Sequence, residues 1–347
     1  MELLHPRTAA DVVEIVRGSG ADGTRLLPVG GRRHIDKGNP CEIDAELWTT
    51  QLDEVIAYDP AEMLAVVGAG LRIGDLRMLL AEGAQEWPVD APADATVGGV
   101  IAAGLASPRH LRVGAMRDSV VQLTSVLGDG RLVTSGARTV KNVSGYDVHR
   151  LMTGSLGTLG VVVSAALKVR PLPRARMTLI ARGDGPAIAT IVRAAVPMAP
   201  VAYTPDEVRV RLEGWPAEVD ELAALVAAAN DTPFEQVDAS RFPGWHTGAP
   251  IVAEVSLPPS AMDEALMGHD HRCVLAGVGS AKVGLNDLDA LVGLRDRVTS
   301  FGGIAPVIHG PGGLGDADMP ALEVHRRLKD AFDPHGVMAP GRYWSGL

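Results

Sequence analysis

The chain has 347 residues, of which 46% are hydrophobic and 21% charged, and its formal net charge is -10 at pH 7. This acidic balance argues against a nucleic-acid-binding protein, because contact with a phosphate backbone requires a basic surface. The 40 glycines and 24 prolines indicate a turn-rich α/β or α+β chain, and the length predicts two or three domains.

The cysteines and the apolar stretches indicate a cytoplasmic protein. Cys41 and Cys273 are too few for a disulfide framework, and they are too few for an iron–sulfur cluster, which takes about four ligands. The opening residues, MELLHPRTAADVVEIV, lack the layout of a secretion signal. Apolar stretches such as VGGVIAAGLA are shorter than the roughly 18 residues of a membrane span. We therefore expect any membrane association to be made through partners.

The first half of the chain predicts short strands mixed with helices. TAADVVEIVR has helical spacing of apolar residues behind Thr8, a good N-cap. RLLPV predicts a strand that leads into a glycine-rich loop. LDEVIAYDPAEMLAVVGAG predicts two strands around an Asp-Pro turn, and IGDLRMLLAEG predicts a helix that ends at Gly83. SVVQLTSVLGDGRLVTSG predicts a hairpin, DVHRLMTG a helix and VVVSAALKV a strand.

Pro171 and Pro173 mark a predicted domain boundary, after which the pattern changes. RMTLIARG, VRVRLEG, PIVAEVSLP and RCVLAGVGSAKV predict strands. AIATIVRAAVPMA, PAEVDELAALVAAAN and LDALVGLRDRVTSF predict helices. This alternation favours an antiparallel sheet backed by helices. PALEVHRRLKDAF predicts a last helix.

One glycine-rich stretch imitates a dinucleotide fingerprint. AVVGAGLRIGDL has a strand, Gly68-x-Gly70 and then a helix, but Gly74 comes one residue too late for G-x-G-x-x-G. No acidic residue ends a clear second strand about 20 positions on. We interpret the stretch as a strand–turn–helix without a ligand.

Three other glycine-rich stretches are candidate ligand loops. PVGGRRHIDKG can form an anion-binding nest with Arg32 and Arg33 beside it, although a surface loop with two solvated arginines has the same spelling. ATVGGVIAAG permits close approach to a flat ligand, or tight helix packing. GSLGTLGVVV contains more glycines than a helix end and a turn require. Three such loops in one domain indicate a ligand more specifically than any one of them.

Three segments, taken in order, resemble a known family. They are PVDAPADATVGGVIAAGLASPRHLRVGAMRD, TVKNVSGYDVHRLMTGSLGTLGVVVSAALKVRPLP and AFDPHGVMAPGRYW. They resemble the FAD-binding oxidoreductases of the vanillyl-alcohol oxidase and p-cresol methylhydroxylase type. Within that superfamily, the spelling is most similar to the group of FAD-binding E subunits of bacterial glycolate oxidases. The resemblance covers the chain up to Pro173 and roughly the last 25 residues.

The resemblance implies an α+β fold with a two-lobed FAD-binding domain, an antiparallel α+β cap domain and a C-terminal segment that returns to the first domain. We place these at residues 1–173, 174–317 and 318–347. FAD would be bound noncovalently, because His34 lies one residue away from the position at which some relatives attach the cofactor. The first loop departs from the family, which has small polar residues there. The two arginines therefore either hold the diphosphate or occupy its place.

Carried over position by position, the resemblance implies a set of cofactor contacts. The first loop would lie against the diphosphate, and the second glycine-rich stretch would follow the diphosphate and the flavin side. Gly114, Arg117 and Asp118 would make ribityl or phosphate contacts. The third stretch would line the cofactor, with Gly160 and Val161 near the adenine. The positions are Gly30, Gly31, Arg32, Arg33, His34, Thr96, Gly98, Gly99, Gly104, Gly114, Arg117, Asp118, Gly154, Ser155, Gly157, Gly160 and Val161.

Oxidation of a 2-hydroxy acid by a flavin requires a base for the hydroxyl proton and an arginine for the carboxylate. The candidates are His309, Arg342 and Tyr343, although His309 is also compatible with a plain loop at a domain junction, and Arg342 with an anchor of the returning segment. His269 and His271 lack further ligands at metal-binding spacing, so we predict no metal site.

The family resemblance implies an FAD-binding subunit of a glycolate-like 2-hydroxy-acid dehydrogenase or oxidase complex. Its expected partners are a larger FAD-binding catalytic subunit and an iron–sulfur subunit that receives the electrons. Two alternatives stay open. One is a free-standing flavin-dependent dehydrogenase, and the other is a flavin-free scaffold subunit that keeps the fold.

Overall fold

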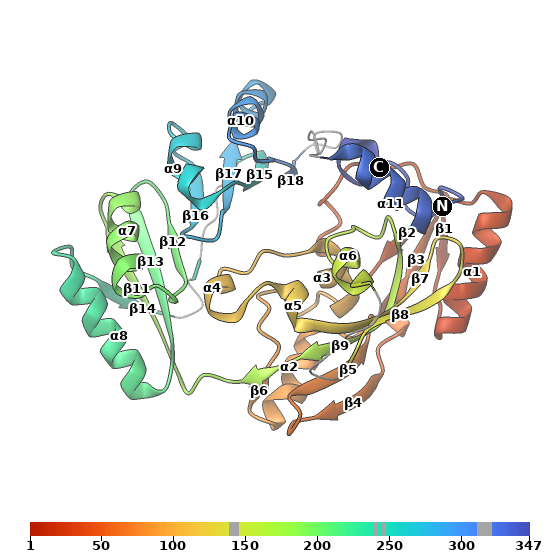
Figure 1. Ribbon diagram of the computed structural model, residues 1–347, viewed down its shortest axis with the longest axis horizontal. Coiled ribbons are helices and arrows are strands. Elements are labelled where there is room, and N and C mark those ends of the chain that lie inside the picture. The colour runs from red at the N-terminus through yellow and green to blue at the C-terminus, as the bar shows by residue number, and fades with distance from the viewer. Residues whose placement is uncertain (139–145, 239–241, 244–247, 311–320) are drawn as a thin grey trace. The chain divides into compact units, whose positions relative to one another are not determined.

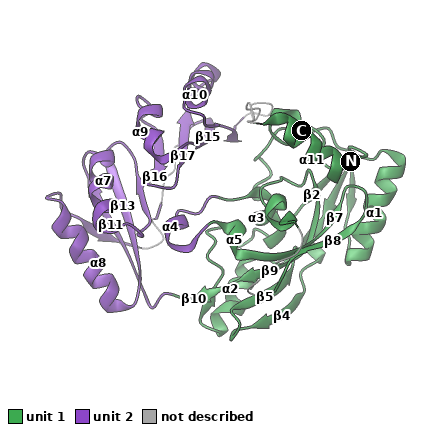
Figure 2. Ribbon diagram, viewed as in Figure 1, with its two compact units in different colours: residues 1–105, 115–172, 312–347 green, residues 106–114, 173–311 purple. Residues whose placement is uncertain are grey.

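The computed structural model describes residues 1–138, 146–238, 242–243, 248–310 and 321–347. The chain divides into two compact units (Figure 2): unit 1 comprises 1–105, 115–172 and 312–347, and unit 2 comprises 106–114 and 173–311. The change of unit after Leu172 lies beside the prolines that mark the boundary in the sequence. The segment 106–114, which we had expected in the first domain, belongs to unit 2.

Unit 1 begins with a three-stranded parallel sheet in the order β1-β3-β2, formed by β1 (Glu2–Leu4), β2 (Leu26–Val29) and β3 (Ala45–Trp48). Helix α1 (Ala9–Asp22) connects the first two strands (Figure 1). The predicted N-cap is confirmed, because the Thr8 hydroxyl accepts from the backbone N–H of Asp11 and the Asp11 carboxylate accepts from that of Thr8. Gly23 ends the helix in the left-handed conformation.

The second sheet of unit 1 is antiparallel, with five strands in the order β4-β5-β9-β7-β8. The predicted strand pairs are confirmed as β4 (Val55–Asp59) with β5 (Leu64–Gly68) and as β7 (Val120–Leu127) with β8 (Leu132–Gly136), and β9 (Gly160–Lys168) lies between β5 and β7. Because β5 is antiparallel to its neighbours, the stretch that imitates a dinucleotide fingerprint is not part of a parallel βαβ unit. A Cβ on Gly68 or Gly70 would meet the carbonyl oxygen of Leu52 or Thr49, so these glycines serve backbone packing.

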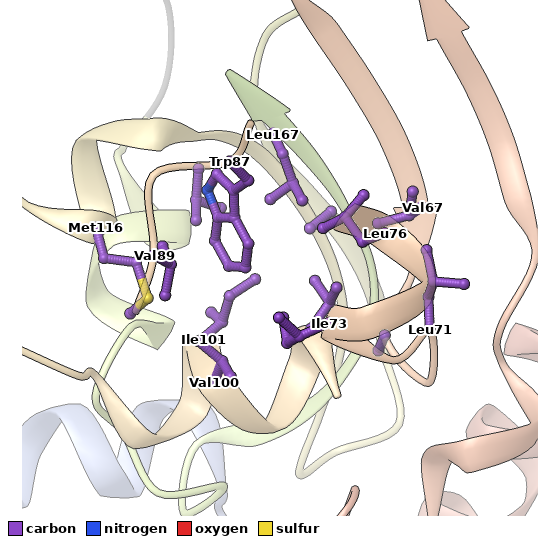
Figure 3. Close-up of a cluster of buried hydrophobic side chains, with 14 of the residues drawn as sticks. Val67, Leu71, Ile73, Leu76, Trp87, Val89, Val100, Ile101, Met116 and Leu167 are labelled. Atoms are coloured by element: carbon purple, nitrogen blue, oxygen red, sulfur yellow. The ribbon is translucent and has the colours of Figure 1, made fainter. Parts of the chain in front are cut away.

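A hydrophobic core lies between the five-stranded sheet and the helices α2 (Ile73–Glu82) and α3 (Val97–Ala103). Figure 3 shows Trp87 among the side chains of Val89, Ile101 and Leu167. The indole N–H of Trp87 donates to the Ser119 hydroxyl at 2.8 Å, so its polar atom is satisfied inside the core. This packing fixes α3, which carries the second glycine-rich stretch.

The C-terminal segment of unit 1 is tied to the rest of the unit by buried polar contacts. Lys329, on α11 (Leu322–Phe332), donates to the carbonyl oxygens of Thr158 and Met338 and to the Asp333 carboxylate, at 2.6 to 2.7 Å. The shorter elements of the unit are η1 (Thr49–Gln51), β6 (Gln85–Glu86), α5 (Met116–Ser119), α6 (Val148–Met152), β10 (Arg170–Pro171) and η4 (Trp344–Gly346).

Unit 2 contains an eight-stranded sheet in the order β14-β11-β13-β12-β16-β17-β15-β18, in which each described pair is antiparallel. Its strands are β11 (Ala175–Arg182), β12 (Val201–Tyr203), β13 (Glu207–Gly214), β14 (Glu235–Val237), β15 (Ile251–Ser256), β16 (Arg272–Leu275), β17 (Ser280–Leu285) and β18 (Val307–His309). The expectation of one strand over RCVLAGVGSAKV is wrong. Gly277 and Gly279 adopt positive φ and turn it into the β16–β17 hairpin.

The helices of unit 2 are α4 (His110–Val113), α7 (Gly185–Ala195), α8 (Pro216–Ala229), α9 (Met262–Ala265) and α10 (Leu288–Ser300), with the short turn η3 (Pro259–Ala261). The fully buried Glu213 carboxylate is one contact between 106–114 and the rest of this unit. Arg211 contacts it at 2.8 Å from the same strand, and Arg109, itself buried, lies 3.7 Å away. A buried carboxylate requires such cationic partners.

Candidate functional site

A pocket in unit 1 collects the first two glycine-rich stretches. It has a volume of about 480 Å³, part of it open to solvent. One wall is the loop after β2, a second is the start and inner face of α3, and Leu156 and Arg342 complete it. The lining residues are Pro28, Val29, Gly30, Gly31, Arg32, Arg33, His34, Ile35, Ala95, Thr96, Gly99, Ala102, Ala103, Leu156 and Arg342.

The glycines of the first loop allow it to touch the segment before α3. A Cβ on Gly30 would lie 2.1 Å from the Thr96 hydroxyl oxygen, and a Cβ on Gly31 would lie 2.4 Å from the Asp94 carbonyl oxygen. The Thr96 hydroxyl also accepts from the backbone N–H of Gly99 at 3.3 Å, as the N-cap of α3. The contact between the first loop and the segment before α3 therefore depends on backbone and small side chains.

The two arginines of the loop have different environments. Arg32, at φ +57°, contacts the buried Glu46 carboxylate at 2.6 Å, and its guanidinium lies 5.6 Å from the centre of the Trp48 ring. The indole N–H of Trp48 donates to the same carboxylate at 2.9 Å. Arg33 instead pairs with Asp94, and both of these side chains are about half exposed. Each guanidinium thus has a carboxylate partner on the protein.

Arg342 brings the C-terminal segment to the pocket. Its buried guanidinium donates to the carbonyl oxygens of Ile35 at 2.7 Å and Lys37 at 3.0 Å, and its own carbonyl oxygen accepts from the N–H of Asn39. Burial lowers the pKa of Arg342. The Arg342 side chain thus connects the C-terminal segment to the residues that follow the first loop. This contact is compatible with the alternative role of Arg342 as an anchor of the returning segment.

The third glycine-rich stretch packs against α3. Gly104, which ends α3 at φ +60°, and Gly154 approach so closely that a Cβ on Gly104 would lie 2.6 Å from the Gly154 Cα. The N–H groups of Gly154 and Leu156 donate to the carbonyl oxygens of Ile101 and Ala102, both at 2.9 Å. The three glycine-rich stretches therefore meet at one place in unit 1.

Other predicted cofactor residues lie away from the pocket lining. A Cβ on Gly98 would meet Ala69, one on Gly157 would meet the Pro28 ring, and one on Gly160 would meet the Val126 carbonyl oxygen. Each of these glycines permits close packing within the protein. The remaining positions outside the lining are Gly104, Gly114, Arg117, Asp118, Gly154, Ser155 and Val161, and Gly114 belongs to unit 2. Residues 139–145 (TVKNVSG), which begin the second of the three family-like segments, lie outside the described residues.

A second pocket of about 430 Å³ lies in unit 1 between the 151–159 segment, α11 and the C-terminal residues. Tyr343 lines it and packs against the His325 ring, with 6.2 Å between ring centres. A tyrosine phenol is neutral at pH 7, and burial raises the pKa of Tyr343 further, so the group is suited to donate a hydrogen bond rather than to act as a base.

The structure divides the catalytic candidates between the two units. Arg342 and Tyr343 belong to unit 1 and face different pockets. His309 is exposed at the end of β18, in unit 2. Their joint role in catalysis stays a prediction.

Sequence reasoning missed the apolar part of the first pocket. Ala102, Ala103 and Leu156 line it, but small and branched apolar residues on a helix carry no signal that separates a ligand wall from a core. Ala102 and Ala103 lie in the quoted VIAAG stretch, so the stretch pointed to them without naming them.

Two family models match the chain. Residues 2–136 match an FAD binding domain, and residues 315–343 match the C-terminal domain of FAD-linked oxidases. The chain belongs to the FAD-binding oxidoreductases of the p-cresol methylhydroxylase type. The resemblance read from the glycine-rich segments is thereby confirmed.

The fold of this family extends over nearly the whole chain. Alkyldihydroxyacetonephosphate synthase superposes with a TM-score of 0.71 on 97% of this chain and 76% of its own, at 16% sequence identity. The predicted α+β fold, with an FAD-binding domain and an antiparallel cap sheet, is confirmed.

Several curated proteins of this oxidoreductase family are similar in sequence. The glycolate oxidase subunit GlcE of Escherichia coli is 29% identical over 84% of this chain and 85% of its own length. A D-lactate dehydrogenase of Archaeoglobus fulgidus is 32% identical over 52% of this chain, and a D-2-hydroxyglutarate dehydrogenase of Xanthomonas citri is 27% identical over 85%. The chain spans only 40% and 60% of the lengths of these last two proteins.

The residues of the first pocket fit the diphosphate of the FAD expected in this family. Backbone N–H groups in a glycine-rich turn and guanidinium groups at its rim are the donors that a diphosphate takes. Gly30, Gly31 and Arg33 would hold the diphosphate, and Thr96 and Gly99 would lie beside it. Among the described ranges, no cluster of three or more histidine, cysteine or acidic side chains is arranged to hold a metal ion, and no helix has the length and apolar character to cross a membrane.

Proposed function

We propose that this chain is the FAD-binding subunit of a complex that oxidises a small 2-hydroxy acid such as glycolate and passes the electrons to a partner. The observation that carries the proposal is the convergence of the first two glycine-rich stretches on one arginine-bearing pocket within unit 1, with Leu156 of the third stretch completing the lining. The similarity to a glycolate oxidase subunit over most of both chains supports the same assignment.

FAD, when bound, would supply a redox carrier for electrons that come from the substrate. The contribution of this chain is to bind and orient. The first loop would hold the diphosphate noncovalently, since His34 is one residue away from the position used for covalent attachment. Arg342 holds the neighbouring residues Ile35 and Lys37 in place through their carbonyl oxygens.

The base that takes the hydroxyl proton of the substrate and the arginine that binds its carboxylate are better assigned to a partner subunit than to this chain. Arg342 donates to two backbone carbonyls in the same unit, which leaves it poorly placed to grip a substrate carboxylate with both nitrogens. We therefore propose that a larger FAD-binding subunit contains the base and the substrate arginine, and that an iron–sulfur subunit receives the electrons.

A flavin-free scaffold is the second candidate, and the pairing of both loop arginines with protein carboxylates favours it. The absorbance spectrum of the purified chain after FAD titration and gel filtration separates the two. Retained flavin bands at near one FAD per chain support the first function, and their absence supports the scaffold.

The subunit role requires a separate measurement. Affinity purification of the tagged chain from its native host should bring down a flavoprotein and a protein with iron–sulfur absorbance. Turnover of glycolate or lactate by the isolated FAD-loaded chain, with a dye as electron acceptor, would instead show a free-standing dehydrogenase.

A further inference from the structure

Two adjacent arginines in the first loop differ in how readily each can leave its carboxylate. The partner of Arg32 is Glu46, whose side chain is 4% exposed, and Trp48 also donates to that carboxylate. Moving Arg32 away would leave a buried carboxylate without its cation, which is strongly unfavourable. Arg32 is therefore a fixed part of the protein.

Arg33 has the opposite surroundings. Its side chain is 54% exposed and that of its partner Asp94 is 43% exposed. An exposed ion pair is held only weakly, since water solvates both groups when they separate. Arg33 can therefore exchange one anionic partner for another at little cost.

The position of this pair connects it to the pocket. Arg33 lines the pocket, and Asp94 directly precedes the lining residues Ala95 and Thr96. Gly31 lies against the backbone of Asp94, since a Cβ there would be 2.4 Å from the Asp94 carbonyl oxygen. The Asp94 carboxylate thus holds the guanidinium of a residue that lines the pocket.

We propose that Asp94 competes with the ligand diphosphate for Arg33, so that binding exchanges the Arg33–Asp94 ion pair for an Arg33–phosphate ion pair. The inference rests on the proposed FAD function of the pocket and identifies Asp94 as a residue that weakens binding. The shared chemistry is a diphosphate, which either a dinucleotide or free pyrophosphate carries.

A double-mutant cycle tests the exchange. The dissociation constant for FAD is measured by titration calorimetry for the wild type, Arg33→Gln, Asp94→Asn and the double variant. Arg33→Gln should weaken binding by about 10- to 100-fold, since a charge-assisted contact is lost. Asp94→Asn should tighten binding by up to about 5-fold, the strength of an exposed ion pair.

The decisive result is whether the effect of Asp94→Asn on the dissociation constant for FAD depends on the presence of Arg33. If the pair exchanges, Asp94→Asn tightens binding only in chains that keep Arg33. Equal tightening with and without Arg33 means that Asp94 merely repels phosphate, and overturns the proposal, as does unchanged or weaker binding in Asp94→Asn. Asp44→Asn is the matched control. Asp44 pairs with Arg25, is 46% exposed and lies outside the pocket lining, so this variant should bind FAD like the wild type.

Inorganic pyrophosphate, used as a second probe, separates failure of the exchange from failure of the FAD assignment. If the wild type binds pyrophosphate with the same pattern across the four chains but does not bind FAD, the FAD function fails and the exchange stands. If FAD binds and the cycle shows no coupling, the exchange fails and the FAD function stands.

Discussion

Glycines at the centre of unit 1 serve mainly to bring protein backbones together. Gly104 is the strongest case, because its backbone is left-handed and the backbone of Gly154, in another segment of the same chain, lies against it. The family resemblance named this glycine as one of several cofactor contacts. It could not show that the neighbour is Gly154 rather than a ligand, because that neighbour is 50 residues away in the chain.

We expect Gly104→Ala to lower the free energy of unfolding by about 1–3 kcal/mol, because alanine disfavours φ +60° and its Cβ would meet the Gly154 backbone. The measurement is urea unfolding followed by circular dichroism. Gly18→Ala is the control. Gly18 lies inside α1 with no atom near its would-be Cβ, so alanine should raise the stability by about 0.5–1 kcal/mol. A Gly104→Ala protein as stable as the wild type would contradict this account.

At the scale of elements, α11 shows how a predicted helix acquires a role that its own pattern does not reveal. The spacing in PALEVHRRLKDAF predicts the helix, and the structure confirms it. The attachment depends on Lys329, which contacts Thr158, Asp333 and Met338. Lysine on a helix is usually solvated, so the sequence offers no means of distinguishing Lys329 from Arg326 or Arg327.

Removing the Lys329 ammonium should cost about 3–5 kcal/mol of unfolding free energy, since the fully buried Asp333 carboxylate would lose its cation. Lys329→Met tests this in urea, with Arg327→Met as the control. Arg327 is exposed on the same helix, and its replacement should change stability by less than about 0.5 kcal/mol. Equal stabilities of the two variants would show that the Lys329 contacts do not hold the C-terminal segment.

At the scale of the whole molecule, the chain consists of two units with separate sheets, and the proposed cofactor pocket is lined by unit 1 residues. A ligand that binds only the folded state stabilises it by RT ln(1 + [L]/Kd), about 2.7 kcal/mol at a concentration of 100 Kd. The stabilisation should be greatest in the unit that binds.

Hydrogen exchange measured by mass spectrometry, with and without excess FAD, checks this expectation. We expect the largest slowing in peptides that cover the first loop and α3, and a smaller change in peptides of β13, in unit 2. Unchanged exchange in the loop and α3 under saturating FAD would place the cofactor elsewhere. The peptides of β13 serve as the internal reference.

The sequence by itself determined many of the helices and strands, the change of pattern near Pro173, the glycine-rich loops and the family, although it predicted one strand where the structure has the β16–β17 hairpin. These depend on short-range periodicity, capping and turn chemistry, which act over a few residues. Tertiary structure alone decided that segment 106–114 joins unit 2, that Gly98 and Gly160 serve packing, and that Arg32 pairs with Glu46 while Arg33 pairs with Asp94. The physical reason is that burial and ion pairing are properties of neighbours in space. The sequence does not distinguish Arg32, which lies beside a buried carboxylate, from Arg33, which lies at the pocket rim. Only the folded chain shows that the first is fixed and that the second can exchange its partner.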